Sequence, residues 1–141
     1  MTTKRILGLD VGNRRIGVAL SDPLGMTAQR LTTIERRDRW HDVEAIRALV
    51  TEHQVEAVVV GLPLTLRGEA GPQADLVTEF IGAVRAALPC PVHPLDERLT
   101  TVQGERALLE TDTSRRRRKQ LIDQVAAQLI LQAYLDGNAS R

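Results

Sequence analysis

The sequence predicts one α/β domain over residues 1–141, built on a mixed five-stranded sheet with helices on both faces. Short apolar runs separated by turn residues fill the first third of the chain, and helical periods then alternate with apolar runs. This order predicts a three-strand meander followed by two parallel strands, joined by right-handed crossovers. The length of 141 residues and the 43% of hydrophobic side chains suit one domain with one core.

The first three strands follow one another closely. Residues 6–11 are an apolar run, and Gly12-Asn13 forms a tight hairpin turn because both residues tolerate positive φ. A second strand covers residues 15–21, and a weaker third strand covers residues 29–34. The simplest arrangement of the three is an antiparallel meander.

The helical period begins after this meander. Residues 38–53 carry apolar side chains at helical spacing, and residues 57–60 form a fully apolar strand of the kind found inside parallel sheets. A loop follows at residues 62–71. Pro72 can begin the next helix, where its missing N–H costs nothing.

The last part of the chain completes the sheet and covers it. Pro89 ends the second helix, and residues 92–95 form the fifth strand. A short helix is expected at residues 101–109. The last helix is expected at residues 114–135, with Gly137 as its stop. Its apolar stripe stays on one face through three turns, as a helix that covers a sheet requires.

The composition excludes several classes of protein. One cysteine, Cys90, can form neither an internal disulfide nor a cysteine zinc site, and we expect a cytoplasmic protein. The apolar stretch before Asp10 is too short for a signal-peptide core, and no apolar run reaches the ~20 residues that span a membrane. The chain has few aromatic side chains, which argues against a single-strand-binding protein that stacks bases on aromatic rings. The net charge of +1, taken alone, argues against a nucleic-acid partner.

Acidic residues fall where ligands gather in α/β sheets, near the carboxyl ends of strands. Asp10 ends an apolar strand, although it can equally cap the hairpin turn. Asp96 and Glu97 leave the fifth strand together, and at most one of them is expected to face a site shared with Asp10; both can also be solvated loop acids. Asp123 lies at the edge of the apolar face of the last helix, where the alternative is an ion pair with Lys119.

Together these acids form a set of oxygen ligands with no His or Cys beside them in the sequence, which favours Mg²⁺ or Mn²⁺ over zinc. Several carboxylates around paired divalent ions suit phosphodiester hydrolysis. Gly8 and Gly12, which flank Asp10, are expected to leave room for a substrate backbone. Ala126 and Ala127 are expected to let the last helix lie close to the sheet.

The densest run of charge consists of five consecutive basic residues at the start of the last helix: Arg115, Arg116, Arg117, Arg118 and Lys119. Cations in the first turn of a helix oppose its dipole and repel one another, so this run favours a polyanionic partner over a merely solvated face. Arg14, Arg15 and Arg98 would add positive charge around the acids. Arg67 lies in the leucine-rich loop after the fourth strand, where it can contact substrate or simply form part of a connection.

Four ordered sequence blocks resemble the bacterial YqgF family, also called RuvX. They are RILGLDVG at residues 5–12 with RIGVA at 15–19, GLPL at 61–64 with Gly68, DERLTT at 96–101, and DQVAA at 123–127 with IL at 130–131 and YL at 134–135. The resemblance covers essentially the whole chain and implies an RNase H-like fold and a metal-dependent nuclease. It also implies that the acidic site residues are Asp10, Glu97 and Asp123, which selects Glu97 over Asp96.

The family is described both as Holliday junction resolvases and as nucleases that mature the 5′ end of the 16S rRNA precursor. The leading interpretation is therefore a Mg²⁺- or Mn²⁺-dependent endonuclease for structured nucleic acid, with precursor rRNA and branched DNA both open as substrates. One alternative is a non-catalytic RNA-binding factor in ribosome assembly. The Asp10-x-Gly12 pattern also resembles the phosphate-binding hairpin of actin-like ATPases, which bind ATP between two such domains. A monomer and a homodimer both suit the sequence.

Overall fold

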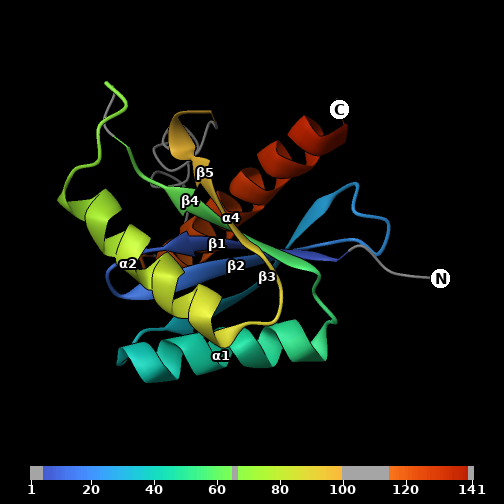
Figure 1. The fold of residues 1–141 in the computed structure, drawn as a ribbon, viewed down its shortest axis with the longest axis horizontal. Helices are drawn as coiled ribbons and strands as arrows, with labels where there is room; N and C mark the ends of the chain where they lie inside the picture. Colours follow the sequence, from blue (N-terminus) through green and yellow to red (C-terminus); the bar gives the residue numbers. More distant parts are fainter. Residues whose placement is uncertain (1–4, 65–66, 100–114, 140–141) are drawn as a thin grey trace.

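A computed structural model describes residues 5–64, 67–99 and 115–139 (Figure 1). A five-stranded sheet lies at its centre, in the order β3-β2-β1-β4-β5. The strands are β1 (Ile6–Val11), β2 (Arg15–Ser21), β3 (Ala28–Glu35), β4 (Ala57–Leu62) and β5 (Val92–Asp96). The first three strands pair antiparallel, β4 runs parallel to β1, and β5 runs parallel to β4. The predicted meander followed by two parallel strands is confirmed.

Helices cover both faces of this sheet. In the described part of the chain they are α1 (Arg39–Glu52), α2 (Pro72–Ala87) and α4 (Arg115–Ala139), and the short 3-10 helix η1 (Glu97–Leu99) follows β5. α1 and α2 lie against one face, and α4 crosses the other (Figure 1). Leu7, Leu9 and Val11 of β1 pack into the main core with α1 and α2. None of the helices within the described ranges is long and apolar enough to span a membrane.

Most predicted element boundaries hold to within two residues. Asp38 caps the start of α1, where its side chain accepts a hydrogen bond from His41 N at 2.7 Å. β4 runs two residues beyond the predicted strand, because its parallel pairing with β5 continues to the register of Leu62 with Asp96. The predicted helix at residues 101–109 lies outside the described residues.

The prediction that Gly137 stops the last helix is wrong, because α4 continues to Ala139. A glycine that ends a helix usually adopts positive φ. Within the described residues, the glycines with positive φ are Gly25 and Gly68. No atom comes within 4 Å of a Cβ built on Gly137. No packing contact therefore forces this residue out of helical geometry.

α4 lies close to the sheet because the strands beneath it carry glycine. A Cβ built on Gly17 of β2 would clash with the backbone of Asp123, and one on Gly8 of β1 would lie 2.7 Å from a side-chain atom of α4. Ala126 and Ala127 on α4 are buried in this contact, as expected from their small size. Gly8 therefore makes room for the helix, and the expectation that it makes room for a substrate backbone is wrong.

A buried ion pair holds the turn between β1 and β2 from the other face of the sheet. The carboxylate of Asp42, 1% exposed, accepts hydrogen bonds from Arg36 Nε and Arg37 N, each at 3.0 Å. Arg36 in turn donates from Nη1 to Gly12 O at 2.8 Å and from its backbone N to Arg14 O at 2.9 Å. Burial opposes ionisation of Asp42, but its hydrogen bonds outweigh burial and hold the pKa of its carboxyl below the usual value.

Gly17→Ala is expected to lower the free energy of unfolding by about 1–3 kcal/mol, because the added methyl group overpacks the contact with α4. Gly82→Ala is the matched control: a Cβ there has open space in α2, so the substitution should stabilise the protein by about 0.5–1 kcal/mol. Urea unfolding measures both values. Wild-type stability in Gly17→Ala would contradict the close packing of α4.

Asp42→Asn is expected to lower the free energy of unfolding by about 1–3 kcal/mol at neutral pH, since Arg36 loses its charged partner. A carboxyl whose pKa is lowered by folding stabilises the protein above its unfolded-state pKa, and this contribution is lost as pH falls through the folded-state pKa. The stability difference between wild type and Asp42→Asn should therefore shrink between about pH 5 and pH 2. Urea unfolding across that range measures it, and a constant difference would refute an ionised Asp42.

Candidate active site

Asp10 lies one residue before the carboxyl end of β1, in the middle of the sheet. Side chains alternate along a strand, so Asp10 shares the face of Gly8, which α4 covers. Only 5% of Asp10 is exposed. Strands β2 and β4 pair with β1 on its two sides, so the backbone that carries this buried acid is firmly held.

Asp123 reaches the same place from α4. Gly17 pairs directly opposite Asp10 in the sheet, and the backbone of Asp123 lies over Gly17. The Asp123 carboxylate accepts a hydrogen bond at Oδ2 from Arg15 Nε at 2.9 Å, and both side chains are about one-fifth exposed. Among the described side chains, Asp123 thus pairs with Arg15 on β2, a residue that the sequence assigned to nucleic-acid binding. The side chain of Lys119, the alternative partner, lies outside the described residues.

The two acids after β5 have different surroundings. Asp96 is held by Arg98, whose Nε and Nη2 lie 2.9 and 2.6 Å from Asp96 Oδ2. The Arg98 guanidinium keeps the pKa of the Asp96 carboxyl below its usual value. Glu97 instead lies over Gly61 of β4, where an added Cβ would come 2.8 Å from Glu97 Oε1. Of this pair, Glu97 is therefore the acid that faces the middle of the sheet.

Asp10, Glu97 and Asp123 line one cavity of about 270 Å³ at the carboxyl ends of β1, β4 and β5. We call it the acidic cavity. Its other lining residues come from the end of β1, the β1–β2 turn, the loop after β4 and the start of α2: Val11, Gly12, Asn13, Pro63 and Gln73. The structure thus brings together three acids that lie far apart in the sequence, from a strand, a 3-10 helix and a long helix.

The chemistry of this cavity suits a hard divalent cation. Its described lining offers three carboxylates and neither His nor Cys. Among the described residues, no three Asp, Glu, His or Cys side chains lie close enough together to surround one ion. Carboxylates in one cavity repel one another, and Arg15 draws Asp123 to one side. The three acids therefore border one shared space without forming a compact ligand cluster.

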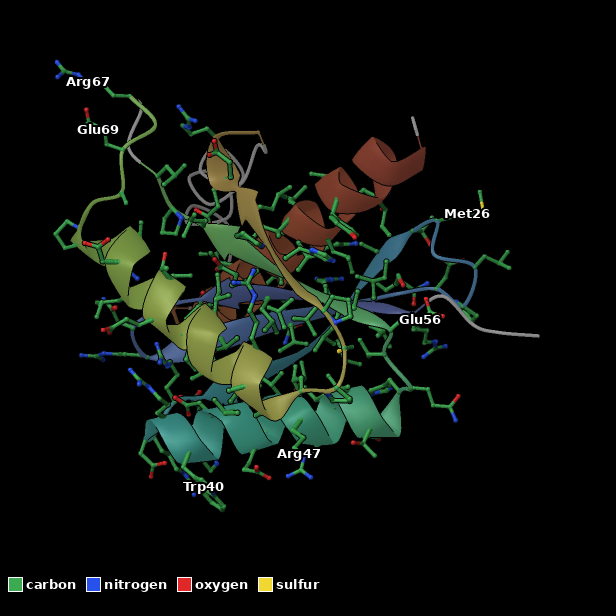
Figure 2. The ribbon with its side chains drawn as sticks, in the orientation of Figure 1. Met26, Trp40, Arg47, Glu56, Arg67 and Glu69 are labelled. Atoms are coloured by element: carbon green, nitrogen blue, oxygen red, sulfur yellow. The ribbon has the colours of Figure 1, made fainter. Side chains whose placement is uncertain are left out.

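The predicted nucleic-acid-binding residues lie in different surroundings. Arg15 and Arg98 are each bound to an acid at the edge of the site. Arg14 is exposed in the β1–β2 turn. Arg67 is exposed in the loop between β4 and α2 and points away from the body of the protein (Figure 2). Residues 115–119 form the first turns of α4, and their side chains lie outside the described residues.

Sequence reasoning missed three residues that frame the acidic cavity. Asn13 and Gln73 line it from the β1–β2 turn and from the first turn of α2. Arg36 stabilises the turn from the face of the sheet that α1 and α2 cover, by donating a hydrogen bond to Gly12 O. The hairpin and the helix start at Pro72 were both predictable, but one amide side chain in such an element carries no signal of its own.

Comparison with known proteins identifies relatives over nearly the whole chain. A family model described as "RuvX: Holliday junction resolvase" matches residues 4–137. A "Putative pre-16S rRNA nuclease" from Moorella thermoacetica is 59% identical over 132 residues, which cover 94% of each chain. A protein of the same name from Clostridium kluyveri is 49% identical over 132 residues, covering 94% of this chain and 96% of the relative.

Two solved structures share the fold at low sequence identity. Thermus thermophilus RuvC, in complex with a Holliday junction substrate, has a TM-score of 0.63 at 16% identity and covers 96% of both chains. Fowlpox virus resolvase, in complex with Holliday junction DNA, has a TM-score of 0.58 at 12% identity and covers 95% of this chain and 98% of its own. The architecture is the RNase H-like fold that the sequence blocks implied. With its match over residues 4–137, the chain belongs to the RuvX family.

Proposed function

We propose that this protein is a divalent-metal-dependent endonuclease that hydrolyses phosphodiester bonds in structured nucleic acid. The observation that carries the proposal is the convergence of Asp10, Glu97 and Asp123 on one cavity at the carboxyl ends of three parallel strands. Membership of a nuclease family supports the same reading. Mg²⁺ or Mn²⁺ is the ion that such an oxygen-only set would take.

The three acids share one part in the proposed reaction, and the residues around them hold them in place. Asp10, Glu97 and Asp123 would hold the metal ions, which, when bound, supply a more acidic water and stabilise charge on the phosphate. The paired strand β1 fixes Asp10, while Arg15 orients Asp123 through Oδ2. These residues therefore enter the reaction with little rearrangement of the backbone.

The proposed substrate is the precursor of 16S rRNA, cleaved near its 5′ end. The relatives at 59% and 49% identity carry the name of a nuclease for this precursor. A Holliday junction is the second candidate, because the family model is described as a Holliday junction resolvase. Both substrates are polyanions recognised largely by shape, and residues 115–119 would bind their phosphates together with Arg14, Arg67 and Arg98.

We also propose a cellular compartment and an oligomeric state for the protein. One domain of residues 1–141 would carry the whole activity in the bacterial cytoplasm, as bacterial relatives named for ribosomal RNA processing suggest. A monomer would suffice for trimming an rRNA end. Resolution of a junction requires cuts on two strands, which a symmetric homodimer would provide.

Asp10→Asn, Glu97→Gln and Asp123→Asn are each expected to reduce cleavage about 100-fold or more, because each removes a carboxylate from the metal ions. A synthetic four-way junction and a precursor rRNA fragment serve as parallel substrates, with Mg²⁺ or Mn²⁺. Glu56→Gln is the matched control, since Glu56 is exposed at the far end of the sheet (Figure 2). Glu56→Gln should cleave at the wild-type rate. A chelator should abolish cleavage by both the wild type and Glu56→Gln.

Wild-type cleavage by Asp10→Asn in Mn²⁺ would refute this mechanism. The non-catalytic alternative makes the opposite prediction in cells: Asp10→Asn would support normal maturation of ribosomes, whereas serine at residues 115–118 would abolish it.

A further inference from the structure

A second hollow continues from the acidic cavity across the edge of the sheet. The two share Val11, Asn13 and Gln73 in their linings. The remaining residues of the second hollow come from the connection after β3, the start of α1 and α2: Arg36, Arg39, Leu76, Val77, Glu79 and Phe80. We call this second hollow the edge groove. The edge groove holds about 110 Å³, which is room for a phosphate group rather than a whole nucleotide, so a strand that leaves the acidic cavity would run along its rim.

The two hollows differ in the charged side chains that line them. The acidic cavity is lined by three carboxylates, whereas the edge groove is lined by Arg36, Arg39 and one acid, Glu79. Arg39 is 63% exposed, and its Nη2 lies 3.9 Å from Glu79 Oε2. A surface ion pair of this kind contributes little stability. Arg39 can therefore exchange Glu79 for a phosphate at small cost.

The floor of the edge groove is fixed. Arg36 is held by the buried Asp42 and by Gly12 O, and its guanidinium carbon lies 5.0 Å from the ring centre of Phe80. Phe80 itself is 3% exposed. The side chain of Arg36 is thus fixed in one position. Arg39 is the cation of the groove whose side chain can move to bind a phosphate.

The entrance to the edge groove is polar without being charged. Asn13 and Gln73 stand where the two hollows meet. Side-chain amides both donate and accept hydrogen bonds, so they can bind a sugar hydroxyl or a base edge without repelling the phosphates. Leu76 of α2 is an exposed apolar side chain in the same lining, and it offers a surface to a base.

We propose that the edge groove binds an unpaired strand of nucleic acid as it leaves the cleavage point. One phosphate lies on Arg39, and the neighbouring nucleotide lies against Asn13, Gln73 and Leu76. This assignment rests on the proposed nuclease function and adds a requirement to it: the substrate must present a single-stranded flank on the α1–α2 side of the scissile bond.

The test measures binding in the Asp10→Asn background, so that cleavage does not interfere. Fluorescently labelled oligonucleotides carry an unpaired flank, in ribose and deoxyribose forms, and anisotropy gives Kd over a series of salt concentrations. Arg39→Gln should weaken binding about threefold to tenfold and reduce the salt slope by about 0.7, the value for one phosphate contact on a single strand. Gln73→Ala should weaken binding without changing the salt slope.

Arg47→Gln is the matched control. Arg47 is exposed on the same helix and is paired with Glu44 at 3.3 Å, but it does not line the groove. Its replacement should leave both Kd and the salt slope unchanged. With a shortened unpaired flank, the Kd of the Asp10→Asn protein should be the same with and without Arg39→Gln. For Arg39→Gln, weaker binding of both the ribose and the deoxyribose oligonucleotide supports the phosphate contact, whereas weaker binding of the ribose form alone would overturn it.

Unchanged Kd and salt slope in Arg39→Gln would overturn the assignment, even if Asp10 proves essential for cleavage. Conversely, weak binding by Arg39→Gln together with full cleavage by Asp10→Asn would support strand binding in the groove. The same result would refute metal-dependent cleavage through Asp10. The two failures are therefore distinguishable.

Discussion

The contact between α4 and the sheet at Gly17 is the constraint on which the candidate site depends. Gly17 pairs opposite Asp10, and the backbone of Asp123 lies over it. Any side chain at this position would push α4 outward and carry Asp123 away from Asp10. Gly61 gives Glu97 the same close approach on the neighbouring strand. Backbone packing thus holds together carboxylates that would otherwise repel one another.

Arginine side chains form ion pairs with acids around this contact. Arg15 pairs with Asp123, which lines the acidic cavity, and Arg98 pairs with Asp96, which precedes Glu97 in the chain. The Arg36 pair supports the turn after Asp10 from the opposite face of the sheet. The net charge of +1 is therefore an average over an acidic cavity and cationic surroundings. A total near zero says little about nucleic-acid binding when the charges are separated in this way.

Periodicity was enough to predict a three-strand meander, two parallel strands and helices on both faces, because burial imposes one period on strands and another on helices. Acids at strand ends and at the edge of the apolar face of the last helix indicated Asp10, Asp123 and the pair Asp96 and Glu97, and the family resemblance selected Glu97 from that pair. Contacts between distant segments were not predictable: Gly8 and Gly17 pack against a helix more than a hundred residues away, and a local pattern cannot show this. For the same reason the ion pair between Arg15 and Asp123 had no sequence signal. The edge groove, made by three elements, had no sequence signal.

The central claim is that Asp10, Glu97 and Asp123 together hold divalent metal. A titration with Mn²⁺, followed by electron paramagnetic resonance of the free ion, tests this claim without substrate and independently of catalysis. Saturable binding by the wild type and strongly weakened binding by Asp10→Asn, with an unchanged fold, is the predicted result. Equal Mn²⁺ binding by the two proteins would contradict the claim.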